Sequence, residues 1–312
     1  MTTHPFEILD TQVHMNAFPI ETAIATMDAM GIGAVVIDEF TGFDHRERVL
    51  PGRELPGGAL RSTAPYSEAA VAEHPERFAY ITRADPDDPE LDVLFAELAA
   101  RPGLVGVRLI PFVPIHPFEL PNHPDLLGVT RAAGARFAED VKSPRYERYF
   151  SLAEQHRVPV FLQINGYCVP GDFSVAHAIA ARYPELILII DHTGMELPVS
   201  WESPRPDRFE QLPQLLELAS FSNISLKWAH GPLLSEALYP FPDVQNVLHR
   251  VVETFGVNRV MWASDWTVDA SRVSWYETLG TILDDDEFTT SEKAALLGGT
   301  ARSVLGWPRS GA

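Results

Sequence analysis

The sequence predicts an α/β fold, a (β/α)8 TIM barrel that forms a single domain over residues 1–312. Eight short runs of apolar and β-branched residues recur along the chain, and they are too continuously apolar for strands with one face in water. Segments with helical periodicity separate these runs, which indicates successive βαβ units. An open, doubly wound sheet is the alternative, but the turn after the first run (DTQVH) lacks the glycine-rich sequence typical of that fold.

The apolar runs define the expected strands. In chain order they are Glu7–Leu9 leading into Asp10, Ala34–Ile37, Phe78–Thr82, Val105–Leu109, Val158–Ile164, Leu186–Ile190, Ile224–Lys227 and Arg259–Ala263. The clearest helical segments between them are Glu90–Ala100, Glu147–His156, Asp172–Arg182, Arg208–Ala219 and Val244–Phe255.

The connections between these elements differ in length. Links from helix to strand are short, whereas links from strand to helix are long and hold most of the 26 prolines. In a barrel the long links lie at the C-terminal face, where binding and catalysis take place. We therefore expect the functional site at that face. The longest link, 110–145, is expected to serve as a lid or to contact a neighbouring subunit.

Composition excludes several classes of partner. With 43 Asp+Glu against 24 Lys+Arg, the net charge of −19 argues against nucleic acid and against anionic membrane surfaces. The N-terminus lacks the features of a signal peptide, no apolar run is long enough to span a membrane, and the single cysteine, Cys168, cannot form an internal disulfide. We expect a cytoplasmic protein with a small-molecule carboxylate or lactone substrate, which assembles as a homo-oligomer or with a paralogue.

Polar side chains gather where the expected strands end. They are Gln12 and His14 for the first strand, Asp38 and Glu39 for the second, Arg108 in the fourth, Gln163 and Asn165 for the fifth, Asp191 and His192 for the sixth, Lys227 and His230 for the seventh, and Asp265 and Trp266 for the eighth. Of these, His14, His192 and Asp265 can converge on one barrel mouth. Two imidazoles and a carboxylate suit zinc, manganese or iron and leave positions open for water.

Five stretches, in the expected order, resemble the amidohydrolase-related (amidohydrolase 2) branch of the amidohydrolase superfamily. They are ILDTQVHM, LVGVRLIP, IIDHTGM, ISLKWAH and RVMWASDWTV. The lactonase-like and dicarboxylate-pyrone-hydrolase-like subgroup is the most similar. The resemblance implies a proton-shuttling role for Asp265, which also touches any metal, and a catalytic role for His192.

Two positions depart from the family pattern. Family members usually have histidines where this chain has Gln12 and Gln163. Glutamine is a poor metal ligand and cannot act as a general base. We therefore expect one divalent metal, with zinc ahead of manganese or iron, held by His14, His192, Asp265 and Gln12; a metal-free site is the alternative.

These observations predict a hydrolase that opens a small anionic or sugar-like lactone with water activated by Asp265. Arg108, Lys227, Gln163, Asn165 and Trp266 are the expected substrate-binding residues; buried Arg108 needs an anion, supplied either by the substrate or by a structural carboxylate. Glu39 and His230 are expected to be ordinary loop residues, with extra metal ligands at the ends of the second and seventh strands as the alternative, and Cys168 is not expected to act as a nucleophile. The alternatives are a decarboxylase of the same family and an impaired partner subunit of a metal-dependent, even oxidative, hetero-oligomer.

Overall fold

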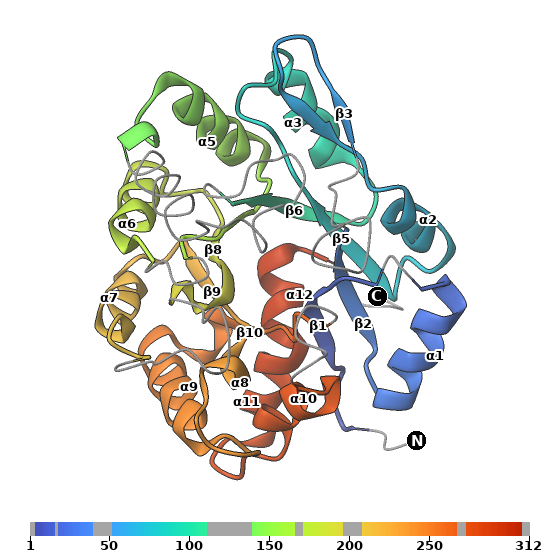
Figure 1. Ribbon diagram of the computed structural model, residues 1–312, viewed down its shortest axis with the longest axis vertical. Helices are drawn as coiled ribbons and strands as arrows, with labels where there is room; N and C mark the ends of the chain where they lie inside the picture. Colours follow the sequence, from blue (N-terminus) through green and yellow to red (C-terminus); the bar gives the residue numbers. More distant parts are fainter. Residues whose placement is uncertain are drawn as a thin grey trace, which may run out of the picture.

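Eight parallel strands form the centre of the molecule, which confirms the predicted (β/α)8 barrel (Figure 1). The computed structural model describes residues 4–15, 18–39, 52–110, 139–165, 171–195, 208–266 and 273–307. Around the barrel the strands are β1 (Leu9–Val13), β2 (Ala34–Asp38), β5 (Phe78–Thr82), β6 (Leu104–Leu109), β7 (Val160–Leu162), β8 (Leu188–Ile190), β9 (Ile224–Trp228) and β10 (Val260–Trp262).

The first strand differs from its expected position. It was expected to end at Asp10, but β1 continues to Val13 and pairs with β2 along its length, with an irregularity between Asp10 and Val13. The backbone N–H of Asp265 then donates to the carbonyl oxygen of Gln12 at 3.1 Å, which joins β1 to the chain leaving β10. Gln12 therefore lies within a barrel strand, not in the loop that follows it.

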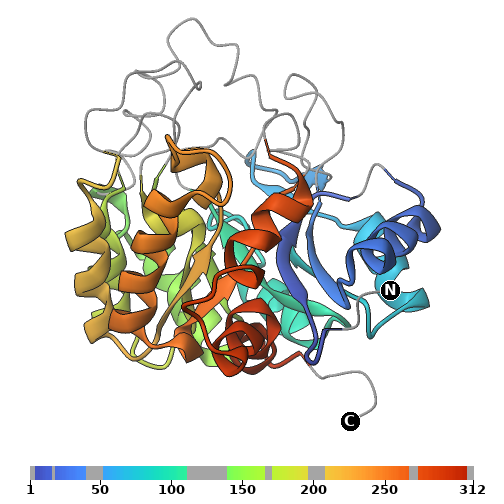
Figure 2. The ribbon, with the colours of Figure 1, turned by 90° about the horizontal axis from the view of Figure 1, so that it is seen from below.

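Helices surround the barrel (Figures 1 and 2). They are α1 (Ile20–Met30), α2 (Pro65–Glu73), α3 (Leu91–Ala100), α5 (Pro144–His156), α6 (Phe173–Arg182), α7 (Leu212–Glu217), α8 (Gly231–Leu234), α9 (Pro242–Phe255), α10 (Trp275–Leu283), α11 (Thr290–Ala294) and α12 (Thr300–Leu305). Outward-facing strand residues such as Val35, Phe78 and Leu188 belong to the apolar layer between strands and helices. A two-stranded antiparallel hairpin, β3 (Gly52–Glu54) and β4 (Leu60–Ser62), lies in the link between β2 and α2.

The interior of the barrel is apolar at one end. The inward-facing side chains there form a second cluster, separate from the layer under the helices: Leu9, Ala34, Val36, Ala79, Ile81, Val105, Phe161, Ile189 and Met261. Ala301 and Leu305 of α12 pack against this cluster, so α12 covers that end of the barrel (Figure 2). The functional site is left to the opposite end, where the strands terminate.

Two predictions concern parts of the chain that the structure does not describe. Most of the 110–145 link (111–138) and Cys168 lie outside the described residues. The lid or subunit contact expected of that link therefore stays a prediction. Within the described ranges, no helix has the length and apolar character needed to cross a membrane.

Candidate active site

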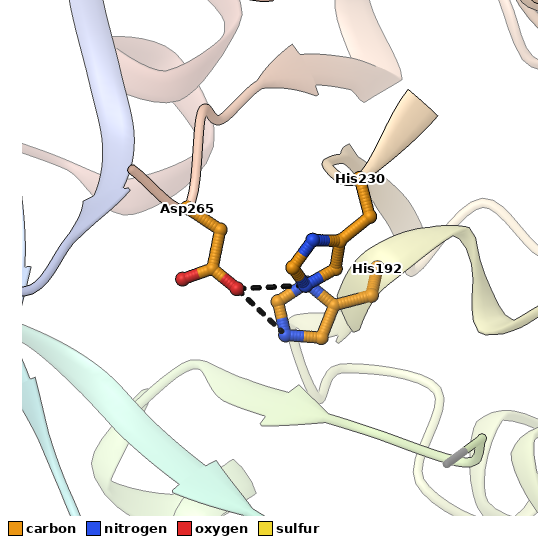
Figure 3. Close-up of side chains that lie close together, drawn as sticks. All are labelled: His192, His230 and Asp265. Atoms are coloured by element: carbon orange, nitrogen blue, oxygen red, sulfur yellow. Dashed lines mark ion pairs between the residues drawn. The ribbon is translucent and has the colours of Figure 1, made fainter. Parts of the chain in front are cut away.

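Three buried side chains, His192, His230 and Asp265, meet at the C-terminal end of the barrel (Figure 3). Oδ2 of Asp265 lies 2.7 Å from Nε2 of His230 and 3.8 Å from Nε2 of His192. The two imidazole rings are 4.4 Å apart between centroids, and one ligand atom from each of the three residues lies within 4.8 Å of the others. The residues follow three adjacent strands, β8, β9 and β10, so the cluster exists only because the barrel is formed.

The backbone turns sharply at each of these residues as the chain leaves its strand. φ is 51° at His192, 57° at His230 and 48° at Asp265, in the left-handed region that residues with a side chain rarely adopt. Three of the six positive-φ residues other than glycine in the described chain are therefore in this cluster. Such conformations concentrate at functional sites, and here they turn three side chains toward one point (Figure 3).

The other oxygen of Asp265, Oδ1, is bound by residues of the first strand and its end. Nε2 of His14 lies 2.7 Å from Oδ1, and the side-chain amide of Gln12 donates to the same oxygen at 3.0 Å. Nδ1 of His14 lies 2.6 Å from the carbonyl oxygen of Asp38. Because a carbonyl oxygen only accepts, Nδ1 is the donor in this contact, and the bond fixes the ring with Nε2 against Asp265.

Two buried cations border the cluster, and both are paired with carboxylates of the barrel. Nε of Arg108 donates to Asp191 at 2.7 Å, and another nitrogen of the same guanidinium donates to Asp38. Lys227, which is fully buried, also pairs with Asp191. Of the two kinds of anion considered for Arg108, the structure places structural carboxylates against it; the substrate-binding roles of Arg108 and Lys227 stay predictions.

The protonation states of the cluster follow from burial and from these partners. Burial, together with the nearby charges of His230 and Arg108, holds the pKa of His192 well below its usual value, so this ring is neutral. Arg108 donates to its Nε2, which places the ring proton on Nδ1. Burial would raise the pKa of Asp265, but His230 and His14 hold it well below its usual value. The site therefore presents an ionised carboxylate beside the lone pair of a neutral imidazole.

Gln163 and Asn165, the two polar residues after β7, have different surroundings. Oε1 of Gln163 accepts from Arg108 at 2.7 Å, so Gln163 borders the cluster. Asn165 is fully buried and donates to the carbonyl oxygen of Met195, which ties the segment after β7 to the segment after β8. This hydrogen bond is with the backbone and not with the cluster.

Trp266 and Glu39 lie near the site and differ in role. Trp266, directly after Asp265, is half-buried, and its ring stacks on Trp275 with centroids 4.9 Å apart. Glu39 accepts from the backbone N–H of Ser67 at 2.9 Å and from its hydroxyl at 2.8 Å, so it caps the N-terminal turn of α2. Glu39 is therefore a structural residue, in agreement with its expected place in an ordinary loop.

His230 is the site residue that sequence reasoning undervalued. It was expected to be an ordinary loop residue, but it is 4% exposed and lies 2.7 Å from Asp265. The available signal was its position three residues after Lys227, at the end of an apolar strand. The left-handed turn that aims His230 inward is not readable from the sequence.

The residues present fit a divalent metal, although the ligand set differs from the expected one. His192, His230 and Asp265 offer two imidazole nitrogens and a carboxylate oxygen close together, a combination suited to zinc, manganese or iron. A metal on Nε2 of His192 would replace the hydrogen bond from Arg108. Gln12 falls outside this set because its Oε1 accepts from Lys227 and its NH2 group faces Asp265. An amide NH2 group offers no lone pair to a metal.

Comparison with protein families gives one match over most of the chain. The sequence model described as Amidohydrolase matches residues 13–307. Comparison with curated proteins found no match.

Comparison with solved structures gives barrels of the same fold at low sequence identity. An amidohydrolase from Burkholderia multivorans with bound zinc has a TM-score of 0.65 and 17% identity, and the similarity covers 97% of this chain and 100% of that one. A candidate 2-pyrone-4,6-dicarboxylic acid hydrolase from Pseudomonas putida has a TM-score of 0.64 and 18% identity, covering 97% and 98%. The 5-carboxyvanillate decarboxylase from Novosphingobium aromaticivorans, complexed with manganese and a nitrobenzoic acid, has a TM-score of 0.56 and 12% identity, covering 97% of each chain.

Proposed function

The chain belongs to the amidohydrolase family, and from this premise we propose that it is a hydrolase that opens a small anionic or sugar-like lactone. The observation that carries the proposal is the ionised carboxylate of Asp265, which contacts His14 through one oxygen and His230 through the other. The description of the Pseudomonas putida protein supports the substrate class, because a 2-pyrone is a cyclic ester.

Asp265 is the proposed proton-transfer group. Its Oδ1 is occupied by His14 and Gln12, so Oδ2 faces the reacting atoms, on the side of His192 and His230. As the water oxygen bonds to the acyl carbon, one water proton passes to Asp265. When the tetrahedral intermediate collapses, the ring C–O bond breaks and the proton passes to the leaving alkoxide oxygen. The product is the open-chain hydroxy acid.

The lowered pKa of Asp265 makes its carboxylate a weak base, so the attacking water requires further polarisation. A divalent metal held by His192, His230 and Asp265 would supply it by lowering the pKa of bound water. The neutral ring of His192 has its lone pair on Nε2, where a metal would replace the hydrogen bond from Arg108. Trp266, half-buried beside Asp265, is the proposed wall of the substrate pocket.

Decarboxylation of an aromatic or enoic carboxylate is the second candidate, because one of the similar barrels is a decarboxylase. The two reactions would use the same centre but release different products. Hydrolysis releases an acid and no gas, whereas decarboxylation releases carbon dioxide.

The test is a substrate panel with the purified chain supplied with zinc or manganese. Sugar lactones, pyrone dicarboxylates and hydroxylated benzoates are assayed for acid release and for carbon dioxide. We expect hydrolysis of at least one lactone, lost in Asp265→Asn and retained in His249→Gln, whose histidine pairs with Asp285 outside the cluster at 2.9 Å. Carbon dioxide release would favour the decarboxylase. Turnover of no compound in either assay would support the impaired partner subunit.

Metal binding is measured separately by equilibrium dialysis followed by elemental analysis. We expect about one equivalent of metal in the wild type and in His249→Gln. His230→Ala should lose most of it, because His230 contributes one of three clustered ligand atoms. Equal metal content in wild type and His230→Ala would contradict the proposed ligand set.

A further inference from the structure

We propose that Lys227 and Gln12 act as a pair of positioning residues: Lys227 fixes the side-chain amide of Gln12 so that its NH2 group donates to Oδ1 of Asp265. The kinetic part of this inference rests on the proposed function, because it assigns a role within the same site. The orientation of the amide is a separate, structural part that is measurable without a substrate.

The contacts form a continuous buried chain from β8 to β1. Nζ of Lys227 on β9 pairs with Asp191 at the end of β8 and also donates to Oε1 of Gln12. Nε2 of Gln12 donates to Oδ1 of Asp265 at 3.0 Å. Lys227, Gln12 and Asp191 each have 0% exposure, so water does not compete for these bonds.

The orientation of the Gln12 amide follows from the chemistry of its two neighbours. An ammonium group only donates hydrogen bonds, an ionised carboxylate only accepts them, and a glutamine amide offers one group of each kind. If the amide of Gln12 were reversed, its NH2 group would face Lys227 and its oxygen would face Asp265. Both contacts would become repulsive, so Lys227 and Asp265 together select one orientation.

This orientation determines which oxygen of Asp265 faces the reaction. Oδ1 receives bonds from Gln12 and from His14 at 2.7 Å, which leaves Oδ2 toward His192 and His230. Glutamine at position 12 thus departs from the family pattern without emptying the position. Where family members present a histidine ring nitrogen, this chain presents the N–H group of an amide. Buried Lys227 orients that amide so that its NH2 group donates to Asp265.

The kinetic test is a double-mutant cycle on the metal-supplied enzyme with a lactone that it turns over. Gln12→Met and Lys227→Met should each lower kcat about 10–100-fold, as loss of an outer partner of a site residue typically does. KM should change by less than about threefold, because both side chains are fully buried and bond to groups of the protein; a change mainly in KM would instead support the substrate-binding role predicted for Lys227. The double variant should lose no more than the worse single variant, because Lys227 acts through Gln12. Ser225→Ala, on the same strand as Lys227, is the control and should leave both constants unchanged.

If the two losses of kcat multiply in the double variant, or if the single variants change mainly KM, then Lys227 and Gln12 do not act as a pair of positioning residues. If Lys227→Met fails to fold, Gln12→Glu takes its place in the test. Glutamate keeps the size of the side chain and the contact with Lys227 but turns an acceptor toward Asp265. It should lower kcat to a similar degree, because the bond to Asp265 is lost, and circular dichroism checks that the variant is folded; wild-type kcat in this variant would overturn the proposal.

The second measurement needs no substrate. The chain has six glutamines, so labelling them with nitrogen-15 gives few side-chain amide signals, and Gln12→Met identifies that of Gln12. We expect this signal to shift in Lys227→Met and in Asp265→Asn and to stay in place in Ser225→Ala. If the amide signal of Gln12 has the same chemical shift in Lys227→Met as in the wild type, the inference is wrong. The expected shifts without turnover of any substrate would support the amide orientation and contradict the proposed function.

Discussion

The two ends of the barrel interior differ in chemistry although the same strands build both. Inward-facing residues alternate along each strand, and on β2 the apolar Val36 is followed two residues later by Asp38. The same change occurs from Ile189 to Asp191 on and after β8. The end covered by α12 is therefore filled with apolar side chains, and the opposite end with ion pairs and the candidate site.

This difference separates two ways of stabilising a buried layer. The apolar end depends on close packing, where lost volume costs free energy in proportion to the cavity formed. The charged end depends on pairing, because a buried charge without a partner is far more costly than one with a partner. The charged layer also gives the site its polar, preorganised surroundings, which the apolar layer cannot provide.

The largest expected effect is the loss of activity on removing the charge of Asp265. Asp265→Asn should lower kcat about 10²–10⁴-fold, the usual contribution of a group that transfers a proton. The fold should persist, because the asparagine has the same size. Steady-state kinetics and thermal melting check this. If the variant melts as the wild type does and keeps its kcat, then the charged end is not the catalytic end.

Breaking the ion pairs of the charged end should strongly destabilise the protein. Arg108→Met removes the guanidinium that binds both Asp38 and Asp191. We expect the free energy of unfolding to fall by about 3–5 kcal/mol, because two buried carboxylates each lose a partner. Chemical denaturation measures the change. A loss below about 1 kcal/mol would place these pairs in the range of surface salt bridges.

At the apolar end, the matching change is the removal of buried volume. Met261→Ala should lower the free energy of unfolding by about 2–5 kcal/mol through the cavity that it leaves. Met261→Leu, which keeps the volume, should cost less than about 1.5 kcal/mol. Both variants should retain wild-type kcat per folded molecule. A lower kcat in Met261→Leu would mean that packing at the apolar end affects the site at the charged end.

Asp10 gives a pH dependence of stability. Burial raises the pKa of Asp10 to about 6, despite hydrogen bonds from Ser264, Gln12 and Trp275. The folded state therefore holds a proton that the unfolded chain releases between about pH 4 and pH 6, so the free energy of unfolding falls as pH rises through this window. The fall should be on the order of 3 kcal/mol.

Denaturation at several pH values measures this dependence, and Asp10→Asn is its control. Asparagine does not ionise, so the variant should lose that part of the pH dependence even where it is less stable overall. An unchanged pH profile in Asp10→Asn would assign the dependence to other groups.

The smallest expected effect belongs to a carboxylate that lies near the site without joining it. Glu39→Gln weakens the cap of α2 and should cost about 1 kcal/mol of stability. Its kcat should stay within about twofold of the wild type, because Glu39 bonds to α2 and not to Asp265. Thermal melting and kinetics check both values. A large loss of kcat would indicate that Glu39 takes part in the site.

The sequence by itself determined the architecture and the face that carries the site. Strands covered on both sides must be apolar throughout, so runs such as Ala34–Ile37 and Phe78–Thr82 were recognisable without any knowledge of their partners. Polar residues that follow other apolar runs, such as His192 and Asp265, indicated where the strands end and therefore the C-terminal face of the barrel. Where polar residues interrupt the apolar run, as Asp10, Thr11 and Gln12 do in β1, the predicted strand limits were wrong.

Only the tertiary structure decided which of these polar residues meet. The bond from Gln12 to Asp265 joins residues 253 positions apart, and the bond from Arg108 to Asp38 joins residues 70 positions apart. Such pairs depend on the register of the strands and on the turn that follows each one. The left-handed backbone at His230 and the pairing of Arg108 with Asp38 and Asp191 depend on this register and on these turns. They form only in the assembled barrel, so local sequence patterns do not predict them.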